Sequence, residues 1–396
     1  MKIRTFPLFI VYFFFAGLAG PSYPESLGDG GLSEVQPAND SAISPSSLDE
    51  IYSARSVWLE AFSSGKYVAE QSSADQGDAG TLGTLAYLVN LIGSSGGTIH
   101  ITGDYEYNVS TSFTIPENIN VAMEKGARLS VKSGVTVTFH SPGNIIAGPD
   151  QDLFGGEGTI SFKSSTGAVY PCWWGAVGDG VSDDTTAIQA AVNACRNVDM
   201  RGKVWLISDP VSIPSFRTID IRGAYIKADC GSDPIFKFMS SENLYILGTG
   251  GYVHGTAGAF LYAEGSTDRP SSYSHYARQI RLEGITISSK TITNFLDCQK
   301  AVRQLMIDKC FAYTSNGIYL NGKCIENFMS DSILFSSTRA SGTYGIKTRA
   351  TGGTRYYCEG LHIDNSLIDA FYDAFDIADL FALTLNNSWI GASGGY

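Results

Sequence analysis

A short apolar repeat in the C-terminal half of the chain constrains its fold more than any other feature. Apolar triplets return every 22 to 25 residues, and two of the intervals are about ten residues longer. The triplets begin at Ile219, Leu244, Ile280, Leu305, Phe328, Leu361 and Leu383. A unit of this length has no room for a helix and cannot bury its own apolar side chains, so successive units must stack. The repeat therefore predicts the coils of a β-solenoid and disfavours the alternative, a β-sandwich of irregular hairpins.

The composition agrees with a β-rich chain. Charged residues make up 17% of the sequence, and it contains 44 Gly, 21 Tyr and 21 Phe, a balance typical of turn-rich β structure. Between residues 97 and 139, short alternating segments separated by Gly, Asn and Pro indicate further strands. Helices are expected over residues 48–71 and 183–195, because both segments carry apolar side chains at helical spacing.

The N-terminal residues have the pattern of a secretory signal peptide. Lys2 and Arg4 precede an apolar run from Phe6 to Phe15, and small residues follow up to Gly20. We expect removal near Ala19, and the alternative is a membrane-anchored or buried segment. The predicted organisation is a leader at 1–20, a linker with a short helix at 21–79, an N-terminal β cap at 80–169 and a β-helix at 170–396. The predicted location is secreted or periplasmic, and the alternative is a virion tail.

Charge and cysteine content exclude several classes of function. The 27 Lys and Arg against 39 Asp and Glu give a formal charge of −12, which disfavours a nucleic-acid partner. The seven cysteines show no metal-ligand spacing, and no phosphate-binding or redox motif is visible, so neither a metal nor an organic cofactor is expected. Cys298 and Cys310 fall on apolar positions and should be buried free thiols. Cys324 and Cys358 are expected in loops, where they could pair.

One long motif precedes the repeat. The residues YPCWWGAVGDGVSDDTTAIQAA at 170–191 resemble the N-terminal motif of the pectate-lyase superfamily, which includes secreted polysaccharide lyases and hydrolases and phage tailspikes. Residues 115–118 and 126–131 are similar to the cap region that precedes this motif, so the resemblance covers about residues 80–396. It implies an all-β, right-handed, single-stranded parallel β-helix with an N-terminal β cap and a short capping helix. It also implies a polysaccharide partner and a monomer or homotrimer. Related enzymes usually have more coils, so a chain truncated at the C-terminus is expected.

The acidic residues of this motif have two interpretations. Asp179, Asp183 and Asp184 could cap the helix that follows or bind a cation. Capping is favoured, because Asp183 lies at the expected N-cap position.

The repeat also predicts columns of side chains, because equivalent residues of successive coils stack. Three positions after the triplet starts lie four carboxylates, and one position after the starts lie outward side chains. The carboxylates are Glu283, Asp308, Asp331 and Asp364, and the outward residues include Tyr245, Arg281 and His362. The second strand of the unit presents Asp297, Tyr319, Lys347 and Asp376 outward.

Stacked carboxylates suggest acid–base chemistry. At a spacing of ~5 Å they repel as anions, which raises one pKa and yields the proton donor and base that glycosidic cleavage needs. We therefore predict catalysis by Asp308, Asp331 and Asp364 with His362 beside them. Substrate is expected to bind Tyr245, Arg281, Tyr319 and Lys347.

Two alternatives stay open. Asp and Asn at strand ends could form a structural side-chain ladder instead. A lyase would use a basic or phenolic group from Lys347, Tyr319, Arg281 or His362. The predicted function is thus cleavage of an extracellular polysaccharide by a hydrolase or lyase. The alternative is a non-catalytic carbohydrate-binding or structural β-helix such as a phage tail or adhesin protein.

Overall fold

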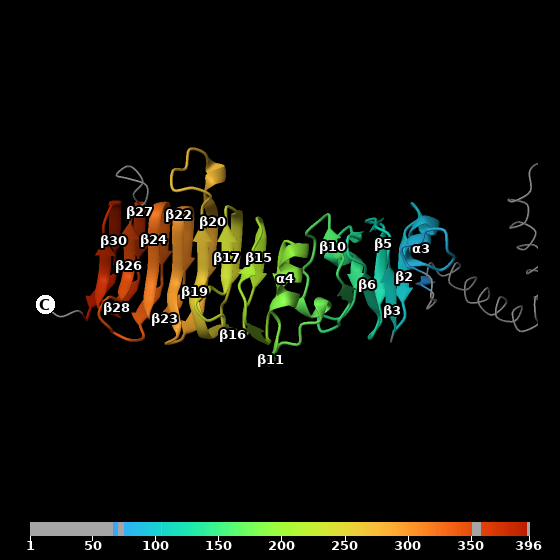
Figure 1. Ribbon diagram of the computed structural model, residues 1–396, viewed down its shortest axis with the longest axis horizontal. Helices are drawn as coiled ribbons and strands as arrows, with labels where there is room; N and C mark the ends of the chain where they lie inside the picture. Colours follow the sequence, from blue (N-terminus) through green and yellow to red (C-terminus); the bar gives the residue numbers. More distant parts are fainter. Residues whose placement is uncertain (1–65, 70–74, 104, 351–357, 394–396) are drawn as a thin grey trace, which may run out of the picture. The chain divides into compact units, whose positions relative to one another are not determined.

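The computed structural model describes residues 66–69, 75–103, 105–350 and 358–393. These residues form a parallel β-solenoid of about 12 turns, which confirms the predicted fold class (Figure 1). The predicted leader, the linker up to residue 65 and most of the helix predicted at 48–71 lie outside the described residues. No helix within the described residues is long and apolar enough to span a membrane.

A first stack of coils, with three strands per coil, occupies the region where a β cap is predicted. Its three sheets are β1 (Lys66–Ala69), β2 (Gly97–Ile101), β5 (Ile119–Met123) and β8 (Ile145–Ile146); β3 (Glu106–Val109), β6 (Arg128–Val131) and β9 (Phe154–Gly156); and β4 (Phe113–Ile115), β7 (Thr136–Phe139) and β10 (Thr159–Phe162). All pairings are parallel. A separate β cap therefore stays a prediction.

Two local predictions near the start of this stack differ from the structure. Lys66–Ala69 forms strand β1 rather than the end of a helix, because it pairs in parallel with β2. Helix α3 (Leu85–Ile92) was not expected from the sequence. Its N-cap is Thr84, whose hydroxyl accepts a hydrogen bond from the Tyr87 N–H at 3.2 Å, and the helix buries Leu85 and Leu88.

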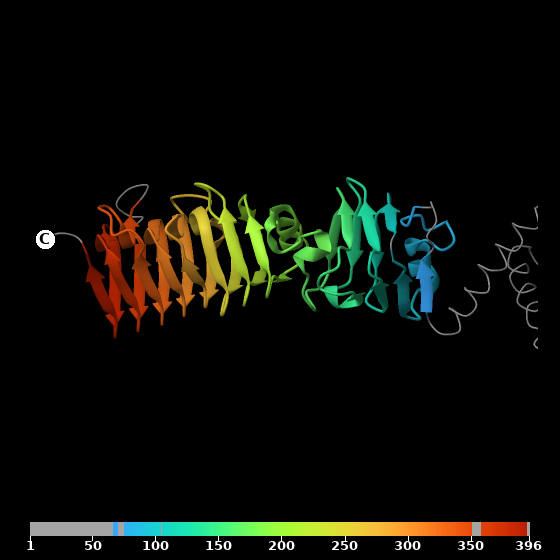
Figure 2. The ribbon, with the colours of Figure 1, turned by 90° about the horizontal axis from the view of Figure 1, so that it is seen from below.

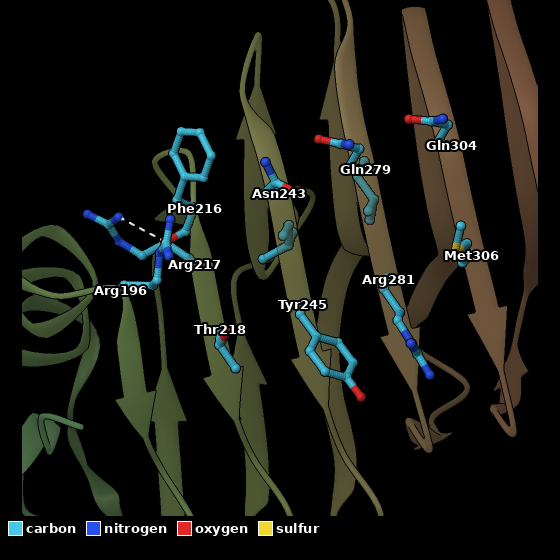
Figure 3. A pocket seen from close by; sticks show the side chains of 12 residues that line it. Arg196, Phe216, Arg217, Thr218, Asn243, Tyr245, Gln279, Arg281, Gln304 and Met306 are labelled. Carbon is cyan, nitrogen blue, oxygen red and sulfur yellow. Dashed lines mark hydrogen bonds between the residues drawn. The ribbon is translucent and has the colours of Figure 1, made fainter. Parts of the chain in front are cut away.

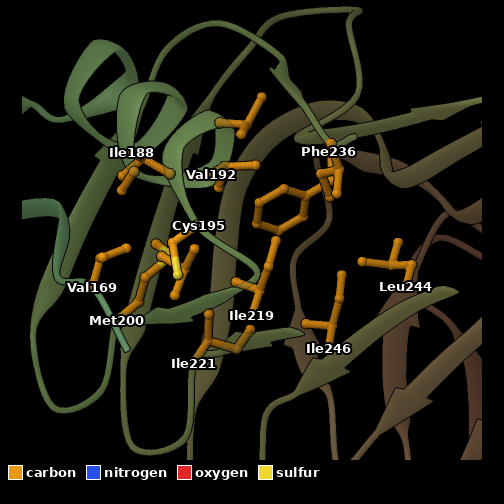
Figure 4. Close-up of a cluster of buried hydrophobic side chains, with 14 of the residues drawn as sticks. Val169, Ile188, Val192, Cys195, Met200, Ile219, Ile221, Phe236, Leu244 and Ile246 are labelled. Carbon is orange, nitrogen blue, oxygen red and sulfur yellow. The ribbon is translucent and has the colours of Figure 1, made fainter. Parts of the chain in front are cut away.

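The motif at 170–191 joins the two stacks. It forms η2 (Pro171–Trp174), β11 (Asp179–Asp183) and α4 (Thr185–Ala194). Helix α4 contacts β10 on one side and β12 and β14 on the other, so it covers the first coil of the larger stack (Figures 1 and 2). Its residues Ile188 and Val192 are buried near Ile219 and Phe236 of that stack (Figure 4).

The acidic residues of the motif bind backbone N–H groups, but only Asp183 binds one in the first turn of α4, as the capping interpretation predicts; the side chain of Asp184 makes no capping hydrogen bond. Asp184 is the N-cap residue, one position after the predicted Asp183. Its carboxylate accepts from the N–H groups of Val177 at 2.7 Å and Gly178 at 3.2 Å. Asp183 accepts from the Thr185 N–H at 3.0 Å. The described residues contain no cluster of His, Cys, Asp and Glu that could hold a metal ion.

The larger stack has three faces, which we call faces I, II and III. Face I contains β11, β13 (Val204–Ile207), β16 (Tyr225–Asp229), the first part of β19 (Tyr252–Glu264), β21 (Thr286–Ser288), β23 (Phe311–Thr314), β25 (Ile333–Ser336), β28 (Leu367–Phe371) and β31 (Trp389–Ala392). Face II contains β14 (Val211–Ser212), β17 (Phe236–Met239), the second part of β19, the first parts of β22 (Ile292–Asp308) and β24 (Asn316–Ser330), β26 (Tyr344–Arg349) and β29 (Asp373–Ile377). Face III contains β12 (Asn197–Asp199), β15 (Arg217–Asp220), β18 (Glu242–Leu247), β20 (Ala277–Glu283), the second parts of β22 and β24, β27 (Cys358–Asp364) and β30 (Leu380–Asn386).

On face III, the register predicted from the repeat agrees with the observed strand pairing at most coils and differs from it at two. Leu244 pairs with Ile280, and Leu361 pairs with Leu383, as predicted. Ile219 pairs with Ile246 instead of Leu244. In β24 the predicted start, Phe328, pairs with the outward Met306, while Asn327 takes the buried position opposite Leu361. The prediction was wrong there because a polar residue occupies an inward position and an aromatic residue an outward one.

The cysteines are all buried and free within the described residues. Cys298 and Cys310 are buried thiols, as predicted. Cys324 and Cys358 lie in β24 and β27 instead of loops. Strand β24 continues through Gly322, which has a φ of 95°, and so includes Cys324.

Candidate functional site

The predicted carboxylate column forms only in part: Glu283 pairs with Asp308 as predicted, but Asp331 does not join the column. Asp308 pairs with Ser330, and Ser330 pairs with Asp364, so the two carboxylates are two coils apart and a hydroxyl lies between them. Asp331 lies one residue beyond this column, in the turn after β24, with a φ of 48°. The register at Asn327 therefore moves Asp331 away from the residues with which it was predicted to act.

These residues form a structural ladder instead. Ser330 Oγ contacts Asp308 at 3.1 Å, and the Asn386 amide donates to Asp364 at 2.6 Å. In the turn, the Asn365 amide donates to Asp331 at 2.5 Å. Asn387 in turn donates to Asn365. We call these residues the turn ladder: Asp308, Ser330, Asp331, Asp364, Asn365, Asn386 and Asn387. Asp331 and Asp364 are exposed, and each accepts a hydrogen bond from an asparagine of the neighbouring coil, which favours the structural interpretation.

The fourth predicted catalytic residue, His362, lies on face III. Its ring stacks on Phe328 with 4.9 Å between ring centroids and 11° between planes. It points outward from the same strand as Asp364, whereas Asp331 bonds to Asn365 in the turn. The structure therefore does not assemble the predicted catalytic group around Asp331.

The second predicted column forms on face II with the expected register. Asp297 pairs with Tyr319, Tyr319 with Lys347, and Lys347 with Asp376. Tyr262 and Lys237 extend it on the other side of Asp297. The half-buried Asp297 carboxyl is thus flanked along the column by two tyrosines.

A second carboxylate lies diagonally across from Asp297. Glu264 pairs with Gln299, two residues beyond Asp297 on the next strand. Strand spacing and rise place the Cα atoms of Glu264 and Asp297 roughly 8 Å apart. We call Asp297 and Glu264 the face II pair.

The two carboxyls of the face II pair have different environments. Burial raises the pKa of Asp297, and the negative charge of Glu264 raises it further, although Gln299 donates to one carboxyl oxygen. Burial acts in the same direction on Glu264, but hydrogen bonds from Lys300 and Tyr262 outweigh it and lower the pKa of Glu264. The Tyr262 hydroxyl donates to Glu264 at 2.7 Å. Opposite shifts at neighbouring carboxyls are the arrangement that separates a proton donor from a base.

The remaining face II residues are held in an ion-pair cluster. Arg349 contacts both oxygens of Asp376 at 2.6 Å, and Lys347 contacts the same carboxylate at 3.0 Å. Lys347 also lies 5.0 Å from the centroid of the Tyr344 ring. Burial raises the pKa of Tyr319, although Arg349 opposes this shift. Tyr319 is therefore a protonated phenol at neutral pH, and both neighbouring cations are already paired.

Tyr245 and Arg281 lie in a groove on face III. The Arg281 guanidinium is 5.1 Å from the Tyr245 ring centroid, and both side chains contact Glu283. A cavity of about 610 Å³ surrounds this pair. Figure 3 shows Asn243, Gln279 and Gln304 in one row on successive strands and Tyr245 and Arg281 in a second row. The predicted substrate-binding residues are thus divided between face III and face II, where Tyr319 and Lys347 lie.

Several residues of these sites were missed from the sequence. Glu264 was missed because the unit around β19 was not aligned with the second-strand column, although Glu264 follows Tyr262 at the two-residue spacing of one strand face. Asn243, Gln279 and Gln304 all have left-handed φ values of 57° to 60°. No sequence pattern marks such positions when the residue is not glycine.

Comparisons with known proteins give two structural similarities. The first is to the A-module of mannuronan C-5 epimerase AlgE6 from Azotobacter vinelandii, with 12% identity over 83% of this chain and 100% of that chain and a TM-score of 0.35. The second is to ORF18 of Geobacillus virus E2, with 11% identity over 92% of this chain and 65% of that chain and a TM-score of 0.20. At these TM-scores neither similarity carries an argument about function. No family model and no curated protein matches the sequence.

Proposed function

We propose that this protein hydrolyses a polysaccharide on face II, with Asp297 as the proton donor and Glu264 as the base. The observation that carries this proposal is the contrast between two neighbouring carboxyls: Asp297 is half-buried beside a negative charge, whereas Glu264 is bound by Lys300 and Tyr262, so their pKa values shift in opposite directions. Tyr262 and Tyr319, on either side of Asp297, supply ring faces against which sugars can pack. The proposal includes membership of the pectate-lyase superfamily and export through the N-terminal leader.

The chemical step needs only the face II pair and water. Asp297 donates its proton to the glycosidic oxygen as the bond between that oxygen and the anomeric carbon breaks. Water forms the new bond to the anomeric carbon, and its proton passes to Glu264. Proton exchange with solvent then restores both carboxyls. In inverting glycosidases such a water lies between two carboxyls ~6.5–9.5 Å apart.

A lyase is a poorer fit to the same face. A phenol can abstract a proton only when it is ionised, so it needs a lowered pKa near neutral pH. Burial instead raises the pKa of Tyr319. Stabilising the enolate needs a cation that is free to contact the substrate, and Lys347 and Arg349 both bind Asp376. These contacts favour hydrolysis over elimination.

The test is a screen of the purified protein against neutral and uronate-containing polysaccharides. Hydrolysis releases reducing ends without the ultraviolet absorbance of unsaturated products. Asp297→Asn should lower this release by about 10²-fold or more. Asp376→Asn, three coils away in the same column, serves as the matched control. Unsaturated products would contradict the proposal, as would unchanged release by a folded Asp297→Asn variant. Binding without release by the wild-type protein would favour the non-catalytic alternative.

A further inference from the structure

Two of the seven cysteines lie opposite each other on neighbouring coils of face III. Cys324 lies within β24, and Cys358 is the first residue of β27. These strands pair in parallel, and Ile325 pairs with Glu359, so the cysteines one residue earlier occupy equivalent positions. Neighbouring strands are ~4.8 Å apart, which is within the ~4.4–6.8 Å between Cα atoms that a disulfide joins. The backbone therefore places Cys324 and Cys358 at a distance that a disulfide can span.

Both side chains point into the core of the solenoid. Neither Cys324 nor Cys358 has exposed surface, and their thiols are hydrogen-bonded to each other. The Cys358 thiol also contacts the carbonyl oxygens of Leu320 and Gly322, each at 3.4 Å. The two sulfur atoms are thus neighbours inside the folded protein.

Cys298, the third cysteine within a strand of the described residues, has no such partner. It lies in β22 and pairs with Ala263 on one neighbouring strand and with Leu320 on the other. Burial raises its pKa, so its thiol stays protonated and packs as a small apolar side chain. Only the positions of Cys324 and Cys358 favour a covalent bond between two of these three residues.

We propose that Cys324 and Cys358 form a disulfide that joins β24 to β27 and stabilises this part of the solenoid. The structure contains both residues as thiols and thus represents the reduced state. The oxidant is a small-molecule disulfide such as oxidised glutathione. One protein thiolate attacks a glutathione sulfur and releases one glutathione thiolate, and the second protein thiolate attacks the resulting mixed disulfide and releases the other. Two protein thiols are oxidised, and their two protons pass to the released glutathione thiolates.

The disulfide has to form during folding. Hydrogen bonding to Cys358 and burial raise the pKa of Cys324, so the folded thiols react slowly with an external oxidant. Once formed, the bond closes the coil that contains β25 and β26 and restricts the unfolded chain. This inference does not rest on the proposed hydrolysis. Because the experiment supplies the oxidant, it does not rest on the proposed export either.

The test refolds the full, reduced chain from urea in a glutathione redox buffer. The remaining thiols are then alkylated, and cross-linked peptides are identified by mass spectrometry. Most of the refolded protein should contain the Cys324–Cys358 cross-link, with the other five cysteines alkylated. Its midpoint of thermal unfolding should be ~5 °C higher than that of the same protein after reduction. Alkylation of all seven cysteines, or a cross-link that uses Cys298, would overturn the inference.

Two variants test whether the effect of reduction comes from this pair. Cys324→Ala should contain no cross-link, and its thermal midpoint should be the same with and without reductant. Cys298→Ala removes a buried thiol nearby and is the matched control, so it should keep both the cross-link and the response to reduction. A wild-type midpoint that does not change on reduction, although the cross-link is present, would contradict the stabilising role.

Discussion

The turn ladder and the face II pair place carboxylates on neighbouring coils of one solenoid, yet their surroundings differ. Asp331 and Asp364 are exposed and accept hydrogen bonds from asparagines of the next coil. Asp297 is half-buried and faces the negative charge of Glu264. Stacking alone therefore does not create an acid–base pair. Burial and the different hydrogen-bond donors of the two carboxyls are what separate their pKa values.

The largest expected difference between the two regions is in turnover. Asp297→Asn should lower the initial rate of reducing-end release by about 10²-fold or more, because the proton donor is lost. Asp331→Asn should leave the rate close to that of the wild type, because the amide can still take part in the turn ladder. The comparison fails if Asp331→Asn is the inactive variant and Asp297→Asn remains active.

A second effect concerns the pH dependence of the rate. The reaction needs Glu264 ionised and Asp297 protonated, and the pKa of Glu264 is lowered while that of Asp297 is raised. The rate should therefore fall as pH rises through the pKa of Asp297, and fall again at lower pH as Glu264 is protonated. Initial rates across acidic to neutral pH give the profile. A rate that rises steadily toward alkaline pH would indicate a different base.

A smaller effect is expected on stability. Asp364→Ala removes the acceptor of the Asn386 amide and should cost about 1 kcal/mol of unfolding free energy. Asp297→Asn should not destabilise the protein near neutral pH. Because the pKa of Asp297 is raised in the folded state, its ionised form is disfavoured there, and the stability it contributes is lost as pH rises through that pKa. Urea unfolding near pH 7 measures the unfolding free energy of both variants. A larger loss of unfolding free energy in Asp297→Asn than in Asp364→Ala would contradict this prediction.

Much of the fold could be predicted from the sequence because apolar periodicity reports directly which side chains point inward. The repeat correctly predicted the register of β18, β20, β27 and β30, and the second-strand column from Asp297 to Asp376 was correct. The register failed at Asn327, whose buried side-chain amide has no hydrogen-bond partner among the described residues. A rule based on apolar residues cannot detect a polar residue in the core.

The candidate site was less predictable for a related reason. A one-residue shift at Phe328 was enough to assign Asp331 to the wrong column, since column membership depends on exact register. The ion pair between Glu264 and Lys300 joins two neighbouring strands, and Lys300 has a left-handed φ of 61° within β22. Sequence spacing does not report such a left-handed residue, so Lys300, which lowers the pKa of Glu264, could not be foreseen as its partner.

The most direct test of the face II pair is a site-resolved titration of the carboxyl groups by ¹³C nuclear magnetic resonance. We expect Asp297 to titrate above the ordinary aspartate value and above Glu264, and we expect Glu264→Gln to lower the pKa of Asp297 by removing the neighbouring charge. An Asp297 carboxyl that titrates at or below the ordinary value, with no response to Glu264→Gln, would contradict the assignment of Asp297 and Glu264 as an acid–base pair.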